Sequence, residues 1–551
     1  MYPLSYGQEQ MWLVDQMLGP AALAAPALCT RITGALDVGA LRQATAYIVD
    51  RHSVLRARFL PTPAGCEQRV VSAPPLDFDL TDLPDAGQAA AACAEEIRRG
   101  FDLTRDPPLR ARVYRIAADD HVLLVLRHHI VWDGESDEIF AAELGALYRQ
   151  FAGGAAADLP PLALQYPDFA RRQREEVSGQ RLEKLVTRAR DAIGDPLPEP
   201  LPLGGPGGRG EYGYAHVVPI APAVGDRIPE FAQEAQATPY MMLLGVFRAW
   251  WSVGAGVDRL LIGCPISGRR RPEYQDLIGY FSNLAVVGHR VDASITPHEV
   301  IARERRGLLE AMTRHDLPYE VLARSLGRSA SRPLVQVAFL YEATPWPDLM
   351  LPGLGTGRFD FDAPNPPPPL DLMVTIGPHG DGLAAKWEHR DPLLSETVRA
   401  MAASFDTMLA RAIEHPGTPI GRLDVPRAEP ATTARADTPQ VTWLTADTGT
   451  PPGSRLEQEI ADTWSELLGR AVPGVHANLF SLGGHSLTVA TLAFRLAEAY
   501  GLPVPMADLM EHPTVAGQAA LIERQLATAL DRLDEAEIVR VLDQLATETH
   551  Q

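Results

Sequence analysis

Two adjacent histidines, His128 and His129, are the residues of this chain best suited to chemistry. They lie in the stretch RHHIVWDG at residues 127–134, which also contains Asp133 and Gly134. An imidazole accepts or releases a proton near neutral pH, so a histidine aimed into a cleft is suited to general base catalysis. Buried histidines that only satisfy hydrogen bonds are also common, and this stretch alone leaves both interpretations open.

The flanking sequence predicts the element that positions the histidines. The stretch HVLLVL at 121–126 is an apolar run typical of a buried strand, and Asp133-Gly134 predicts the turn that follows it. The histidines therefore come where a strand ends. A rigid element at such a place aims a side chain into a cleft more accurately than a loop does.

Composition limits the classes of function. Of the 551 residues 46% are apolar and 22% charged, as in ordinary globular proteins, and a net charge of −20 argues against partners such as nucleic acid or an anionic membrane. The four cysteines are widely spaced, which argues against a zinc site or a disulfide scaffold. The N-terminus MYPLSYGQEQ lacks the pattern of a signal peptide, and no apolar run is long enough to span a membrane. We expect a cytoplasmic protein without a metal site.

Proline- and glycine-rich stretches mark the expected boundaries between folding units. They are residues 192–210, 363–369 and 426–453, of which the last is predicted to be an interdomain linker. Before this linker, strand-like runs alternate with amphipathic helices such as 395–414, which predicts an α/β fold in two lobes. We place the lobes at residues 1–180 and 181–425.

The part after the linker, residues 454–526, is predicted to be a small helical domain. Apolar spacing indicates helices at 455–469, which Gly469 ends, and at 486–501. The loop LFSLGGHSL at 479–487 leads into the second of these helices, so Ser486 is placed to cap it. From local sequence alone, a helix cap and a functional serine are equally acceptable interpretations of Ser486.

The whole helical domain resembles the peptidyl carrier (thiolation) family. The stretches that carry the resemblance are RLEQEIADTWSELLG, NLFSLGGHSL and MADLMEHPTVAGQAALI. The resemblance implies a four-helix bundle in which Ser486, the serine of the GGHS motif, bears 4′-phosphopantetheine. Ala477 departs from the aspartate that the family usually has before Asn-Leu-Phe.

The first 425 residues resemble the condensation domains of nonribosomal peptide synthetases. RHHIVWDG matches the HHxxxDG signature, and further motifs follow in family order: YPLSYGQEQMWLV (2–14), RHSVLRARF (51–59), YPDFA (166–170), IGYFSN (278–283), RHDLPYE (314–320) and SRPLVQVAF (331–339). The fold implied is two chloramphenicol-acetyltransferase-like lobes that form a V with a tunnel between them. Segments of the C-terminal lobe, including GCPISGR (263–269), would cross over the other lobe as a latch.

The resemblance implies separate roles for the signature residues. His129 is expected to accept the proton of the attacking amine or to orient that amine, and His128 to support the loop. Asp133 is expected to hold the loop by pairing with Arg269, and Gly134 to allow close approach of the substrate, with its N–H turned toward a developing oxyanion. Ser282 departs from the bulkier apolar residue that is usual in its motif, so this segment gives no acceptor preference.

The order of the domains implies an acyltransferase that makes amide bonds between carrier-bound substrates. Ser486 would hold the acceptor, and an upstream carrier protein would bring the donor acyl thioester. No adenylation domain lies between the two parts, so we expect a separate adenylating enzyme to load the carrier, after a phosphopantetheinyl transferase has modified Ser486. Residues 527–551 form a tail whose predicted amphipathic helix at 530–546 either caps the carrier domain or docks a downstream synthetase or release enzyme.

Three other functions fit the same resemblance. Ester formation with a hydroxyl acceptor uses the same signature. Epimerisation domains share it too, but they normally follow their carrier. A condensation fold that only recruits a partner is the non-catalytic alternative, against which the intact HHxxxDG argues. Heterocyclisation is disfavoured, because that class replaces both histidines with aspartate.

Overall fold

The structure is a computed structural model. It describes residues 1–62, 65–72, 76–201, 203, 213–328, 333–342, 349–362, 368, 370–428, 430, 449–480, 482–484 and 486–530. Residues 1–60 and 67–437 form one compact unit, and residues 438–551 belong to a second. The expected excursion at 363–369 and the expected linker at 426–453 lie largely outside the described residues, and the predicted helix at 530–546 does so almost entirely.

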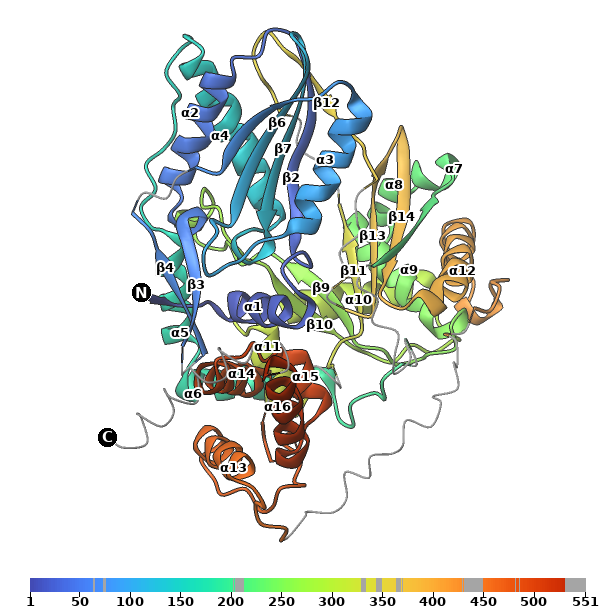
Figure 1. The fold of residues 1–551 in the computed structure, drawn as a ribbon. Helices are drawn as coiled ribbons and strands as arrows, with labels where there is room; N and C mark the ends of the chain where they lie inside the picture. The colour runs from blue at the N-terminus through green and yellow to red at the C-terminus, as the bar shows by residue number, and fades with distance from the viewer. Residues whose placement is uncertain are drawn as a thin grey trace. The chain divides into compact units, whose positions relative to one another are not determined.

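The N-terminal lobe of the larger unit is built on a five-stranded sheet. Its strand order is β12-β2-β7-β6-β5, with bounds β2 Ala24–Thr33, β5 Phe78–Asp82, β6 Leu109–Ala117, β7 Asp120–His128 and β12 Gly355–Arg358. Helix α3 (Ala86–Arg99) packs Ala89 and Cys93 against Val122 and Leu124 of β7. Helices α2 (Val38–Arg51) and α4 (Gly134–Phe151) lie on the other side of the sheet (Figure 1). Strand β7 is thus covered on both faces, as its apolar run predicts.

Two helices and a small sheet lie beside the five-stranded sheet. The helices are α1 (Tyr6–Leu18) and α5 (Tyr166–Glu176), and the small sheet has the order β1-β4-β3, with bounds Tyr2–Pro3, Gly65–Val70 and Ala57–Thr62. Helix α6 (Gly179–Ile193) instead packs Ala189 and Ile193 against Leu261 and Val286 of the C-terminal lobe. Ser5 begins α1 as a capping box, because its hydroxyl accepts from the Gln8 amide while the Gln8 side chain accepts from the Ser5 amide. This cap fixes the start of a helix that contacts the 3-10 turn His129–Val131, which we call the histidine turn.

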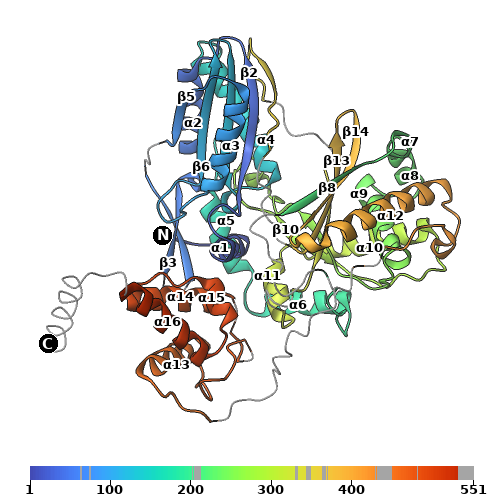
Figure 2. The same cartoon turned by 45° about the vertical axis from the view of Figure 1, so that its right-hand side comes forward.

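The C-terminal lobe has a six-stranded sheet of its own (Figure 2). Its order is β10-β9-β11-β13-β14-β8, with bounds β8 Tyr214–Pro219, β9 Ile262–Ile266, β10 Asn283–Val287, β11 Val337–Tyr341, β13 Leu372–His379 and β14 Gly382–His389. The helices of this lobe are α7 Pro222–Gly225, α8 Ile228–Glu234, α9 Pro239–Val253, α10 Pro297–Met312, α11 Tyr319–Ser325 and α12 Ser395–Glu414. Phe247 and Trp250 of α9 pack with Phe339, Trp387 and Phe405 in the main core.

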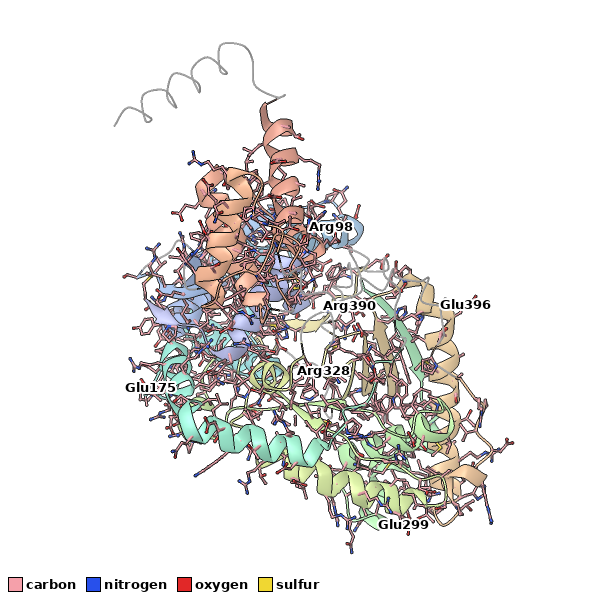
Figure 3. The ribbon with its side chains drawn as sticks, turned by 90° about the horizontal axis from the view of Figure 1, so that it is seen from below. Arg98, Glu175, Glu299, Arg328, Arg390 and Glu396 are labelled. Atoms are coloured by element: carbon pink, nitrogen blue, oxygen red, sulfur yellow. The ribbon has the colours of Figure 1, made fainter. Side chains whose placement is uncertain are left out.

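The surface of this lobe follows ordinary helix electrostatics. Glu299 and Glu396, both labelled in Figure 3, are exposed in the first turns of α10 and α12. Negative charge is favourable at these positions, because the unpaired N–H groups of a helix start carry partial positive charge. The helix expected at 395–414 is confirmed, with α12 covering the same residues.

The strand that joins the two lobes is not the predicted one. Residues 262–266 of the expected latch form β9, which pairs with β10 and β11 inside the C-terminal lobe. The segment that crosses is β12, Gly355–Arg358, which adds antiparallel to β2 at the edge of the N-terminal sheet. The expectation for 263–269 is therefore wrong for its strand residues, because pairing with β10 and β11 satisfies their backbone N–H and C=O groups within the C-terminal lobe.

The second unit is helical, as predicted. Its helices are α13 Arg455–Leu468, α14 Ser486–Tyr500, α15 Met506–Glu511 and α16 Val515–Leu530. Gly469 ends α13 in the left-handed conformation, at φ +64°, and the indole of Trp464 donates to Gln518 across the interior. Helix α16 continues to Leu530, so the boundary expected at 526 falls inside a helix.

Among the described helices, none combines the length and the apolar character that crossing a bilayer requires.

A buried ion pair in the C-terminal lobe gives a test of the fold. Arg248 of α9 and Glu304 of α10 pair at 2.5 Å, with side chains 2% and 0% exposed. Replacing Arg248 with Met leaves the buried carboxylate without its guanidinium, so we expect the free energy of unfolding to fall by roughly 3–5 kcal/mol. In urea denaturation the matched control Arg227→Met, which removes an exposed pair with Glu230, should cost about 1 kcal/mol or less. Equal costs for the two variants would contradict this assignment.

Candidate active site

The histidine pair occupies the turn between β7 and α4. Strand β7 ends at His128, a 3-10 turn covers His129–Val131, and Asp133 is the N-cap of α4, which begins at Gly134. The His129 amide donates to the Leu23 carbonyl at 2.9 Å, and the Trp132 amide donates to the His129 carbonyl at 3.2 Å. The predicted strand end is confirmed. After the 3-10 turn begins, the two imidazoles point to different neighbours, His128 to Asp15 and His129 to Tyr280.

His128 is fully buried and both of its ring nitrogens are engaged. Its Nδ1 accepts from the Ile130 amide at 3.1 Å, so Nε2 carries the proton and donates to Asp15 Oδ1 at 3.2 Å. The edge of Phe101 closes over the ring, with centroids 6.0 Å apart. This arrangement leaves His128 no free nitrogen for a substrate, which favours the supporting role expected for it.

His129 is only half-buried, and its ring has no hydrogen-bond partner at Nδ1 among the described residues. The ring meets Tyr280 edge to face, with centroids 5.2 Å apart. Burial, and then the positive charge of Arg127, lower the pKa of His129 to about 3. The imidazole is therefore neutral at physiological pH and has a lone pair available. It is also a weak proton acceptor in the free protein, which favours hydrogen bonding to an amine over full removal of its proton.

Asp133 is committed to structure at both carboxylate oxygens. Its Oδ1 accepts from the Ser136 amide at 3.0 Å, from the Ser136 hydroxyl at 2.7 Å and from Arg269 at 2.5 Å. Its Oδ2 accepts from the Phe281 amide at 3.0 Å. The pairing with Arg269 expected from the sequence is confirmed, and both side chains are buried. This network joins the histidine turn of one lobe to residues 269–281 of the other.

The same network positions Tyr280 against His129. The Tyr166 hydroxyl donates to the Tyr280 carbonyl at 2.6 Å, and Ser136 Oγ accepts from the Gly279 amide at 3.2 Å. The Arg269 guanidinium also lies over the Phe281 ring, 4.2 Å from its centroid. Tyr166, Gly279 and Tyr280 all belong to sequence motifs, but nothing in their spacing predicts that the bonds of Tyr166 and Gly279 hold Tyr280 against His129.

Gly134 lies where the chain leaves space. A Cβ at this position would meet no atom of the described residues within 4 Å, and its φ is not positive. Neither crowding by the protein nor backbone strain therefore requires glycine here. The Gly134 N–H has no acceptor among the described residues, as befits the first residue of a helix.

A cavity of about 330 Å³ opens beside Tyr280, on the side of the histidine turn formed by α1, α5 and residues 268–283. Ser5, Asn283 and Glu320 are among its lining residues, and four arginines also line it: Arg172, Arg181, Arg270 and Arg271. Burial raises the pKa of Glu320 to about 7. Two of these arginines are paired with acids of the same lining, Arg271 with Glu176 at 2.8 Å and Arg181 with Asp316 at 2.6 Å, so the cavity has a mixed charge.

The second unit has a helix start at the residue expected to carry phosphopantetheine. Helix α14 begins at Ser486, after Gly483 with φ +95° and a buried Gly484. A Cβ on Gly484 would lie 2.8 Å from the Leu479 carbonyl oxygen, so this loop can pack closely only with glycine. The N-terminus of a 15-residue helix favours a phosphate group. These residues fit the attachment of phosphopantetheine.

Comparison with known families matches both units. Residues 1–432 match the family described as "Condensation domain", and residues 458–522 match "Phosphopantetheine attachment site". Only residues 433–457 separate the two matches.

Curated relatives include a tripeptide synthetase and a chondramide synthase. Phosphinothricin tripeptide synthetase PhsB of Streptomyces viridochromogenes is 34% identical over 444 residues, which cover 78% of this chain and 37% of PhsB. Chondramide synthase cmdD of Chondromyces crocatus is 31% identical over 435 residues, which cover 77% of this chain and 11% of that protein. The chain therefore spans less than half the length of these curated relatives.

Solved structures share the fold of the larger unit. The X-domain from teicoplanin biosynthesis has a TM-score of 0.68 at 24% identity, covering 77% of this chain and 97% of that one. The first condensation domain of the CDA synthetase has a TM-score of 0.62 at 18% identity, covering 77% and 98%. The expected α/β condensation fold and its helical carrier domain are thus confirmed.

The Asp133–Arg269 pair gives a prediction on stability. Asp133→Asn and Arg269→Met should each lower the free energy of unfolding by roughly 3–5 kcal/mol, because each leaves a buried partner uncompensated. The double variant should lose less than the sum of the two, by about 1 kcal/mol or more. Denaturation of the three variants measures this coupling. Additive losses would mean that the two side chains do not stabilise each other.

The depressed pKa of His129 gives a prediction on pH. In the unfolded chain the imidazole has a pKa of about 6.5, whereas in the folded protein its pKa is about 3. Acid therefore protonates the unfolded state first, and the free energy of unfolding falls as the pH is lowered from about 6.5 toward about 3. Histidine-detected NMR should therefore show His129 neutral from pH 8 down to 5. Arg127→Met should raise the pH at which His129 becomes protonated, because it removes the positive charge that lowers the pKa of His129. Protonation of His129 between pH 6 and 7 in the unaltered chain would contradict the burial argument.

Proposed function

We propose that this chain, which belongs to the condensation-domain family and carries a phosphopantetheine attachment domain, is an acyltransferase that forms amide bonds. An acceptor amine tethered at Ser486 would attack the acyl thioester that an upstream carrier protein brings. Phosphopantetheine, when attached, supplies the thiol that holds an acyl group as a thioester. The observation that carries the proposal is the neutral, half-buried imidazole of His129, which has no partner at Nδ1 among the described residues and packs against Tyr280, a residue that lines a cavity formed by both lobes.

His129 acts on the amine. A nucleophilic amine must be neutral to attack and gains positive charge as the new bond forms. The His129 lone pair can accept a hydrogen bond from this nitrogen, which orients the amine and stabilises the developing charge. A low pKa keeps the lone pair free at every pH at which the amine itself is reactive. Positioning of two tethered reactants supplies much of the remaining rate enhancement.

Gly134 acts on the carbonyl. Its N–H has no partner among the described residues and stands at the positive end of α4, beside open space. A carbonyl oxygen placed there would gain a hydrogen-bond donor as it becomes an oxyanion. Asp133 and His128 serve as positioning residues, because their polar atoms are already bonded within the protein.

The partners follow from the carrier domain. A phosphopantetheinyl transferase would modify Ser486, and an adenylating domain outside the matched segments would supply the activated acceptor. Only residues 433–457 separate the two matched domains, which leaves no room for adenylation between them. The −20 charge of the chain is consistent with protein partners, since it disfavours nucleic acid.

The test uses the full chain with Ser486 converted by a phosphopantetheinyl transferase and aminoacyl-coenzyme A. A donor carrier domain bearing an N-acetyl-aminoacyl group is then added, and intact-protein mass follows the acyl group. We expect the donor acyl mass to appear on this chain, and His129→Ala to slow that transfer by about 100-fold or more. Ser486→Ala should gain neither the phosphopantetheine arm nor the donor acyl group. Gly134→Ala should fold normally but transfer the donor acyl group more slowly.

The outcomes separate the alternatives. Full-rate transfer in His129→Ala would refute its catalytic assignment. Inverted acceptor stereochemistry without a gain of mass would replace condensation with epimerisation. Transfer to a hydroxyacyl acceptor in preference to an aminoacyl one would replace the amide with an ester.

A further inference from the structure

Arg127 is a cation beside His129 without a partner among the described residues. It is the last residue of β7 before the histidine pair, and its side chain is half-buried. Its Nε is enclosed and bonds to no atom of the described residues, and the guanidinium forms no ion pair within them. Buried arginines elsewhere in the described residues differ from this: Arg110, Arg248 and Arg269 each bond to a carboxylate.

Such a cation is costly to keep. Enclosing the Arg127 Nε–H without a carboxylate or carbonyl to receive it loses hydration that nothing restores, whereas the two terminal nitrogens are not among the enclosed atoms that lack a partner. Burial accordingly lowers the pKa of Arg127 from its usual value. Two acids lie close enough to influence it, but Asp133 is committed to Arg269, and Asp137 accepts from the Trp132 indole at 2.7 Å. A binding site that lacks its ligand has this character.

The alternation of β7 decides which way Arg127 faces. Val122 and Leu124 lie on the α3 side of the strand, so Arg127 projects to the opposite side, toward α4 and Asp137. His128, next along the chain, turns under the sheet to Asp15. Arg127 acts on the charge of His129, and it does not line the cavity beside Tyr280. Of the two neighbours of His129, Tyr280 thus lines that cavity and Arg127 does not.

The charges that develop during the reaction indicate that Arg127 lies on the side of His129 that the donor occupies. During attack the acceptor nitrogen becomes positive and the donor carbonyl oxygen becomes negative. A fixed guanidinium beside the amine would oppose the reaction, whereas beside the donor it would assist it. The acids on this side, Asp137 and Glu342, have pKa values raised by burial, to about 6 for Asp137. Asp137 belongs to α4 of the N-terminal lobe, and Glu342 directly follows β11 of the C-terminal lobe.

We propose that Arg127 is a specificity-determining residue that binds an anionic group, a carboxylate or other oxyanion, carried by the donor acyl chain. This inference rests on the function proposed above, because it needs a donor acyl group beside His129. A charged arginine forms its strongest hydrogen bonds with oxyanions, often through two parallel N–H donors. Asp137 would weaken the binding of the anion by its own charge, and so tune affinity to allow release.

The test compares donors that differ only in charge. The donor carrier is loaded with N-acetyl-glutamyl or N-acetyl-glutaminyl groups, and with the aspartyl and asparaginyl pair, since these are matched in size. In the unaltered chain we expect the acidic donor of at least one pair to be favoured by about tenfold or more in kcat/KM. Arg127→Met should abolish this preference while it still transfers the neutral donors. Asp137→Asn should increase the preference.

Two further measurements separate this role from a structural one. Arg127→Met should unfold at the same temperature as the unaltered chain or higher, because it removes an unpaired cation. The control Arg31→Met, which removes an exposed pair with Asp120 on the same sheet, should leave donor preference unchanged. Binding of amide-linked acyl-pantetheine analogues, which cannot react, should show the same preference for acidic groups without any turnover.

Several results would overturn the inference. Equal rates and equal binding for acidic and neutral donors in the unaltered chain would do so. A loss of rate in Arg127→Met that is equal for acidic and neutral donors would leave Arg127 only its effect on the reacting oxyanion, and would refute its recognition of an anionic group on the donor. A large fall in melting temperature would make it structural. If the unaltered chain transfers no donor at all, the proposed function fails, whereas the binding assay with unreactive analogues still decides whether Arg127 recognises anions.

Discussion

The buried ion pair between Asp133 and Arg269 is the interaction on which the arrangement of the candidate site depends. Asp133 caps α4, which directly follows the histidine turn, and the same carboxylate bonds to Arg269 and to the Phe281 amide from the other lobe. Because both side chains are buried, neither tolerates the loss of the other. The pair thereby fixes the distance between His129 and Tyr280, two side chains that come from different lobes and meet with ring centroids 5.2 Å apart.

Burial makes the His129 imidazole a much weaker base than an exposed histidine. An exposed imidazole would be partly protonated at neutral pH, whereas this ring, enclosed near Arg127, has its pKa lowered to about 3. The lone pair is always available, but its affinity for a proton is small until negative charge appears nearby. The oxyanion of the reacting carbonyl would supply that charge during attack. His129 would then bind a proton most strongly in the transition state, which is the difference that accelerates a reaction.

The sequence predicted local features well, because they depend on neighbouring residues. The strand end before His128, the whole of α12 and the stop at Gly469 each follow from periodicity or a turn residue. The Asp133–Arg269 pair was also expected, through the resemblance to a family. The crossing strand Gly355–Arg358 was missed, since two glycines in four residues give no strand signal. Tyr280, Ser136 and the isolation of Arg127 were missed as well, because each depends on contacts, or their absence, between segments far apart in the chain.

The charges around His129 are asymmetric, and this asymmetry bears on the direction of transfer. Tyr280 presents an uncharged ring on one side, while Arg127 is a fixed cation that lies outside the Tyr280 cavity. An amine that becomes positive is better placed near the aromatic ring, and a carbonyl that becomes negative is better placed near the guanidinium. If the two arms exchanged places, both developing charges would meet unfavourable surroundings. If this chain holds its own acceptor on Ser486, as we propose, it needs such a distinction, because both substrates would be thioesters on identical arms and their tethers could not tell them apart.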